Sequence, residues 1–141
     1  MNLRQTIIIR TDLQFPTGLL CAQVAHLHMD RLRIELNAGE FHPSEREFRF
    51  KIGPHEGAEK VHEWLQSPYV FVHGVPNLEV LNHFHAKAIN NGVQTHQWRD
   101  TVFVDISDTQ REAFSDVMIG IVLGPDDSDK IKAVIGDLPL L

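Results

Sequence analysis

Histidine is the residue type with the most obvious chemistry in this chain, which contains nine of them. Imidazole nitrogens are common zinc ligands, so clustered histidines would be the first sign of a metal site. His26 and His28 are two residues apart, as are His83 and His85, and on a helix this spacing puts the members of each pair on different faces. The sequence contains no HExxH motif and no pair of cysteines. We therefore predict no metal site.

The serines and the single cysteine are the candidate nucleophiles. No serine lies in a G-x-S-x-G motif, the strained turn that exposes the nucleophile of α/β-hydrolases. Cys21 lacks a sequence context that marks a reactive thiol, and one cysteine cannot form an internal disulfide. Gly18 precedes a predicted helix but belongs to neither G-x-G-x-x-G nor G-K-S/T. The sequence therefore does not predict a nucleotide-phosphate loop.

Net charge bears on the class of partner. A charge of −6, with histidine neutral, is unusual for a protein that binds RNA, because phosphates are normally contacted by a basic face. A local patch is still compatible with this charge, since the stretch 31–51 is richer in basic residues than the C-terminal third. Its basic residues are Arg31, Arg33, Arg46, Arg49 and Lys51. The same mixed charges also fit an ordinary solvated surface.

Length and composition predict one domain over residues 1–141. With 141 residues, 43% of them hydrophobic, the chain can bury one core without metals or disulfides, whereas two domains would each be marginal. The start, MNLRQTIIIR, lacks the apolar core and cleavage site of a signal peptide. No apolar run approaches the roughly 18 to 20 residues needed to cross a bilayer. We expect a soluble, cytoplasmic protein that does not span a membrane.

Hydrophobic patterning predicts strands alternating with helices. Runs of β-branched and aromatic residues predict strands over residues 5–13, 69–75, 95–99 and 117–123, the third in one reading continuing to 104. Helical spacing predicts helices over 19–36, 59–66 and 78–90, the last with Asn77 as N-cap, and a final helix after Asp126. Gly124 and Pro125 should end the fourth strand, and residues 37–54 form a variable excursion.

This alternation indicates an α/β fold. We expect a three-layer sandwich, in which a mixed, mainly parallel four-stranded sheet is covered by helices on both faces.

Three stretches in register resemble the archaeal and eukaryotic type of peptidyl-tRNA hydrolase, the type 2 family. Residues 7–26, IIIRTDLQFPTGLLCAQVAH, are similar to the family's opening strand, its R-x-D-L turn and a helix that begins G-K-x-A-A-Q-x-x-H. Residues 92–100, GVQTHQWRD, resemble the strand leading to an R-D pair. Residues 121–141 resemble the G-I-G-P turn, final helix and apolar C-terminus. The order of elements agrees over nearly the whole chain.

The resemblance implies hydrolysis of the ester between a peptide and the terminal ribose of tRNA. A positioned water must attack an activated carbonyl, and the oxyanion must be stabilised while a proton is transferred. No metal or organic cofactor is implied. The implied substrate makes tRNA the expected partner. Family members commonly form dimers, so the resemblance also suggests a second copy of the chain as a partner.

The resemblance also implies a site. Asp100 would orient or activate water, Gln23 would offer amide hydrogen bonds, and Asp12 would join them at the carboxyl ends of the strands. Gln23 and His26 would share one face of the first helix. The implied substrate-binding residues are Arg10, Thr17, Gly18, His26 and Arg99.

Two departures from the family pattern open an alternative. Leu19 stands where the family has a lysine, which removes a cation able to bind phosphate or polarise an oxyanion. The family's short connection after the aspartate becomes the longer, acidic stretch 100–116, which would repel a phosphodiester backbone. Either Arg10, Arg99 or Thr17 substitutes for the lysine in an active hydrolase, or the chain is a catalytically inactive or repurposed binding protein.

Overall fold

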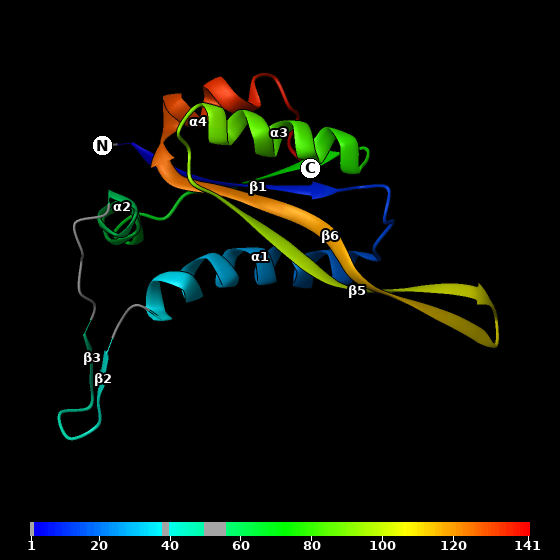
Figure 1. The fold of residues 1–141 in the computed structure, drawn as a ribbon, viewed down its shortest axis with the longest axis horizontal. Helices are drawn as coiled ribbons and strands as arrows, with labels where there is room; N and C mark the ends of the chain where they lie inside the picture. Colours follow the sequence, from blue (N-terminus) through cyan, green and yellow to red (C-terminus); the bar gives the residue numbers. More distant parts are fainter. Residues whose placement is uncertain (1, 38–39, 50–55) are drawn as a thin grey trace.

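The computed structural model describes residues 2–37, 40–49 and 56–141, and its centre is a four-stranded sheet with strand order β4-β1-β6-β5 (Figure 1). The strands of this sheet are β1 (Leu3–Arg10), β4 (Val70–Val75), β5 (Thr95–Ser107) and β6 (Gln110–Asp127). The helices are α1 (Thr17–Asn37), α2 (Glu56–Leu65), α3 (Leu78–Asn90) and α4 (Ser128–Ile135). The predicted α/β class and the mixed four-stranded sheet are confirmed.

The prediction of a mainly parallel sheet is wrong. Only β1 and β4 pair in parallel among the described strands, whereas β6 is antiparallel to both β1 and β5. The reason is the turn at Asp108 and Thr109, which joins β5 directly to β6. Two residues are enough for a hairpin, while a parallel pair needs a long crossover.

The run Ile7–Ile9 shows how the sheet is covered. Successive side chains of a strand point to opposite faces. Ile8 packs in one buried cluster with residues of α3 and α4, including Leu81 and Ile131. Ile7 and Ile9 pack in a second cluster with Leu27 of α1. Figure 1 shows α3 and α4 on one side of the sheet and α1 on the other.

Local signals set the ends of α3 but not of β6. Asn77 caps α3 as predicted, because its side-chain oxygen accepts a hydrogen bond from the Val80 amide at 2.9 Å. The predicted end of the strand at Gly124 and Pro125 is wrong. A register shift lets β6 continue to Asp127, which pairs with Leu3. Gly124 adopts a φ of 82°, and its amide donates to the Gln94 carbonyl at 2.8 Å.

The stretch after Asp100 is a hairpin rather than a connection. Residues 103–116 of β5 and β6, here called the arm, extend beyond the helices (Figure 1). Four large apolar side chains of the arm are 46% to 61% exposed. They are Phe103, Val104, Ile106 and Phe114. The two strands remain paired as far as Ser107 and Gln110.

The predicted excursion contains a second, smaller hairpin, formed by β2 (Glu40–His42) and β3 (Glu47–Arg49). Residues 38–39 and 50–55, which include Lys51 of the basic stretch, lie outside the described residues. Over the part of the chain that is described, no helix is long and apolar enough to cross a membrane.

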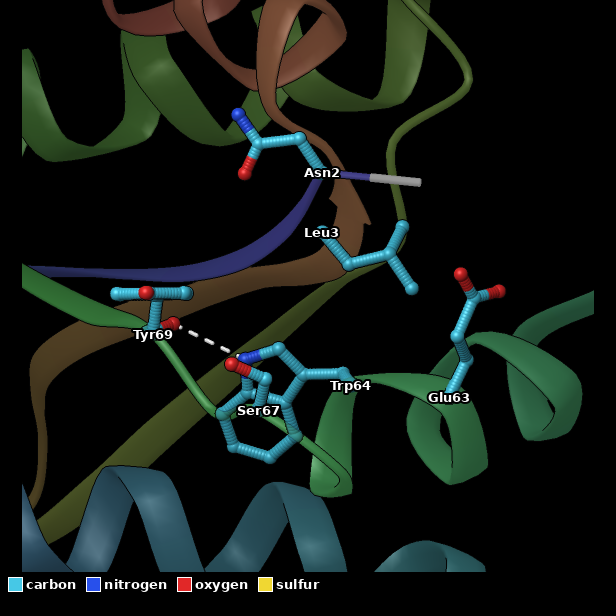
Figure 2. Close-up of a pocket in the computed structure, with 6 residues that line it drawn as sticks. All are labelled: Asn2, Leu3, Glu63, Trp64, Ser67 and Tyr69. Atoms are coloured by element: carbon cyan, nitrogen blue, oxygen red, sulfur yellow. Dashed lines mark hydrogen bonds between the residues drawn. The ribbon is translucent and has the colours of Figure 1, made fainter.

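Helix α2 attaches to the sheet through Trp64, which is 1% exposed. Its indole Nε1 donates to the Tyr69 carbonyl at 3.0 Å (Figure 2). A pocket of about 80 Å³ lies beside this ring, between α2 and the start of β1. The polar side chains of Asn2, Ser67 and Glu63 also line this pocket. Among the residues that Figure 2 draws, none of these three side chains is hydrogen-bonded to another. We assign this region to packing.

Candidate active site

A cleft of about 650 Å³ lies between the start of α1 and the β5–β6 hairpin. Leu13, Phe15 and Leu19 contribute apolar surface from the α1 side. Three of the predicted site residues also line it, namely Gln23, His26 and Asp100. The structure therefore brings together Gln23 and Asp100, which are 77 positions apart in the sequence.

Gln23 is the centre of a hydrogen-bond chain in this cleft. Its Oε1 accepts from Trp98 Nε1 at 2.8 Å, and its Nε2 donates to Asp100 Oδ2 at 2.9 Å. An indole nitrogen is only a donor, so the Trp98 contact fixes which end of the Gln23 amide is oxygen. Gln23 is 3% exposed, so this chain is shielded from bulk water.

Both oxygens of Asp100 are held. Oδ2 accepts from Gln23, and Oδ1 accepts from the backbone amide of Thr101 at 2.7 Å. The Asp100 side chain is only partly buried, so it remains open to the cleft. A carboxylate oriented by two donors and open on one side can position a water molecule.

Strand and helix periodicity explains why these side chains meet. Trp98 and Asp100 are two apart on β5 and share the face that α1 covers. Gln23 and His26 are three apart on α1 and share one side of the helix. The His26 ring lies 5.4 Å from the Trp98 ring, centroid to centroid. A register shift between Asp100 and Val102 adds a local irregularity at the site, as is common beside active sites.

Asp12 is not among the residues that line the cleft. Its carboxylate faces Arg10, with Nε to Oδ1 at 3.0 Å and Nη2 to Oδ2 at 2.8 Å. Arg10 Nη1 also donates to the Met118 carbonyl at 3.1 Å. The hydrogen bonds from Arg10 hold the pKa of Asp12 below its ordinary value. Arg10 and Asp12 thus form a pair that ties the end of β1 to β6.

The remaining predicted residues lie around the cleft. Thr17 and Gly18 form the exposed start of α1, next to the lining residue Leu19, which is 45% exposed. Arg99 is exposed and donates to the Asp116 carbonyl at 3.2 Å, so it is directed along the hairpin. It is not among the lining residues.

Sequence reasoning missed three residues of the site: Trp98, which bonds to Gln23 behind the cleft, and the lining residues Phe103 and Arg111. Trp98 could have been found, because it shares strand parity with Asp100 and aims at the same helix. Phe103 and Arg111 line the cleft only because the chain turns back at Asp108. No local pattern in the sequence predicted that turn.

Within residues 2–37, 40–49 and 56–141, no three histidine, cysteine, aspartate or glutamate side chains are grouped so that they could hold a metal ion. His96 contacts Asp30, and Asp30 also accepts from Arg33 at 2.8 Å.

Comparison with known proteins gives a consistent result. The family model described as peptidyl-tRNA hydrolase PTH2 matches residues 3–141. The chain is 30% identical over 143 residues to a peptidyl-tRNA hydrolase of Sulfurisphaera tokodaii, with 100% of each chain covered. It is 33% identical over 138 residues to that of Nanoarchaeum equitans, with 97% of each covered. A solved protein of unknown function from Agrobacterium tumefaciens shares the fold, with a TM-score of 0.56, 10% identity, and coverage of 100% of this chain and 98% of that one.

Proposed function

Because this chain belongs to the peptidyl-tRNA hydrolase PTH2 family, we propose that it hydrolyses the ester that joins a peptide to the terminal ribose of tRNA. The observation that carries the proposal is the hydrogen-bonded pair of Gln23 and Asp100 in the cleft. Full-length relatives named peptidyl-tRNA hydrolase support tRNA as the substrate.

Asp100 is the proposed catalytic base. A carboxylate has about four acceptor positions, and Gln23 and Thr101 use two of them. A water held by a remaining position would attack the ester carbonyl while its proton passes to Asp100. The bond between the carbonyl carbon and the ribose oxygen then breaks, and the ribose hydroxyl leaves with the proton that Asp100 returns. Gln23 keeps the carboxylate oriented, and Trp98 keeps Gln23 in the required amide orientation.

The start of α1 is the proposed oxyanion-stabilising element. The first four amides of an α-helix have no partner within the helix, and the helix dipole places about half a positive charge there. Leu20 is the first residue of α1 whose amide donates to the carbonyl four residues before it, that of Pro16, at 2.9 Å. Thr17 and Gly18 lie in this turn, and Leu19 retains its backbone amide although it lacks the lysine cation.

His26 is the proposed side-chain contact to substrate, because it lines the cleft beside Trp98. Asp12 would act through Arg10, whose guanidinium it orients. Arg10 now donates to the Asp12 carboxylate, and Arg99 donates to the Asp116 carbonyl. Each arginine would have to leave this acceptor in order to bind substrate. The inactive alternative rested on Leu19 and the acidic stretch 100–116, and neither of these removes the hydrogen bond between Gln23 and Asp100.

The test is release of tRNA from an N-acetylated aminoacyl-tRNA. Wild type should release it, and Asp100→Ala should lower the rate by at least about 100-fold, the usual contribution of a positioned base. Gln23→Ala should lower it by a smaller factor. Asp137→Ala, which removes an exposed carboxylate after α4, should change little. If wild type releases tRNA no faster than Asp100→Ala, hydrolysis by this site is ruled out.

Leu19→Lys separates an active enzyme from an impaired one. A gain in rate would mean that the position still accepts a useful cation. An unchanged rate would favour the helix start as a sufficient oxyanion site.

We propose further that residues 1–141 form one domain, a three-layer sandwich, that works in the cytoplasm as a homodimer. The two buried clusters on opposite faces of β1 support the layering. Family membership supports the location and the dimer. A single cooperative unfolding transition and a dimer mass by light scattering are the expected results.

A further inference from the structure

We propose that Phe103 and Arg111 of the arm bind the single-stranded 3′ end of tRNA, Arg111 by contact with a backbone phosphate and Phe103 by stacking on a base. This inference rests on the proposed function, since it names how the same cleft recognises its substrate.

The first observation is the distribution of charge in the cleft. Among the described residues that line it, Arg111 alone carries a permanent positive charge, beside the carboxylates Asp100 and Asp105. Arg10 and Arg99 do not line it, and they donate to the carbonyls of Met118 and Asp116. With a net charge of −6, the chain needs a local cation wherever it contacts phosphate.

The second observation is the aromatic side chain beside this cation. Phe103 is 61% exposed and lines the cleft, and Arg111 Cζ lies 6.0 Å from its ring centroid. A base can stack on any aromatic face, and an arginine beside it adds attraction for the backbone. An exposed phenylalanine next to an arginine is therefore suited to single-stranded nucleic acid.

The third observation is that Arg111 can be released. Its Nε donates to Asp105 Oδ1 at 2.8 Å, but the two side chains are 64% and 70% exposed. An ion pair this exposed is weak, because water screens it. A phosphate can therefore replace Asp105 at small cost.

The other acidic residues of the arm do not enter the cleft. Asp108, Glu112 and Asp116 are absent from its described lining. Asp116 lies 3.9 Å from Arg99, and Glu112 pairs with Val104 across the hairpin. At the proposed contact, the repulsion expected from this acidic stretch therefore comes from Asp105 in the cleft and from Asp108, which lines a neighbouring pocket with Arg111.

The experiment measures binding of deacylated tRNA to the full chain as a function of salt. Arg111→Gln should weaken binding and lower the slope of log K against log salt by about 1, the signature of one lost phosphate contact. Lys132→Gln is the matched control. Lys132 is 58% exposed, its Nζ also lies close to an aspartate, 3.6 Å from Asp129 Oδ1, and it does not line the cleft. Equal losses in the two variants would overturn the proposal, because they would reflect net charge alone.

Asp105→Asn and Asp108→Asn test the same contact with the opposite sign. Both remove one carboxylate from the arm, but only Asp105 pairs with Arg111. Asp105→Asn should tighten binding more than Asp108→Asn does. A greater effect of Asp108→Asn would contradict the proposal.

Phe103→Leu tests the stacking and identifies the ligand. It should weaken binding of deacylated tRNA about 5-fold or more, since stacking on an aromatic ring is lost. Normal tRNA binding together with altered preference for the aminoacyl side chain would mean that Phe103 contacts peptide, and the proposal would fail. Because binding is measured without turnover, an inactive protein that still binds through Arg111 would sink the proposed hydrolysis and leave this inference standing.

Discussion

The β5–β6 hairpin has two halves that are paired by the same ladder but differ in burial. In the half inside the molecule, residues 118–126 of β6 are buried without a break. In the arm, residues 103–116 of both strands are exposed. Strand pairing therefore does not require a covered face, provided that the pair grows out of a buried sheet. The buried half positions Asp100, and the exposed half is free to contact a partner.

Two ion pairs of β5 and β6 repeat this contrast. Asp126 Oδ1 lies 2.6 Å from Lys60 Nζ, and their side chains are 3% and 16% exposed. Asp105 and Arg111 are separated by 2.8 Å at 70% and 64% exposure. Similar distances in different surroundings should have very different effects on stability.

The largest expected effect is that of Asp126→Asn. Removing one partner of a buried pair should lower the free energy of unfolding by about 3 kcal/mol. Asp105→Asn should change it by less than about 1 kcal/mol. Urea unfolding of both variants provides the measurement. Similar losses would show that the arm contributes to stability as the buried half does.

Lowering the pH should reduce the difference in free energy of unfolding between wild type and Asp126→Asn. Burial alone would raise the pKa of Asp126, but hydrogen bonds from Lys60 and from the Asp127 amide outweigh it and lower the pKa. A carboxyl with a lowered pKa stabilises the fold above its unfolded pKa of about 3.9, and this stabilisation is lost as the pH falls through the folded value. When urea unfolding is measured from pH 7 down to pH values below about 3.9, the free energies of unfolding of wild type and Asp126→Asn should converge. A gap that stays constant would argue against this origin.

Val102 and Phe103 mark the boundary between the two halves. Val102 is 7% exposed and Phe103 is 61% exposed, although they are neighbours on β5. Val102→Ala should cost about 2 kcal/mol through lost burial. Phe103→Ala should fall within about 0.5 kcal/mol, as for most surface changes. Thermal unfolding would reveal a misplaced boundary if Phe103→Ala were the more harmful change.

Trp98→Phe gives a smaller effect, confined to the buried half. It keeps an aromatic ring but removes the indole N–H that fixes the Gln23 amide. We expect a loss in kcat of about 10-fold, the size of one hydrogen bond, with little change in tRNA binding. Arm variants should show the reverse. A Trp98→Phe enzyme impaired only in binding would place Trp98 in substrate recognition instead.

The sequence predicted those features that depend on local signals. Asn77 and the helical spacing after it gave the bounds of α3, and the run Ile7–Ile9 gave the buried strand β1. The meeting of Gln23 with Asp100 followed from the family resemblance. The arm could not be predicted, because its apolar residues face no core and its turn lacks glycine and proline. Because the arm was not predicted, the direction of β6 and the position of Arg111 could not be predicted either.

The most direct test compares Asp100→Asn with Asp105→Asn in single-turnover release of tRNA. Each variant removes one carboxylate from the same cleft, one in the buried half and one in the arm. We predict that Asp100→Asn lowers the rate by at least about 100-fold, while Asp105→Asn keeps or exceeds the wild-type rate. Equal rates for the two variants would contradict the assignment of catalysis to Asp100.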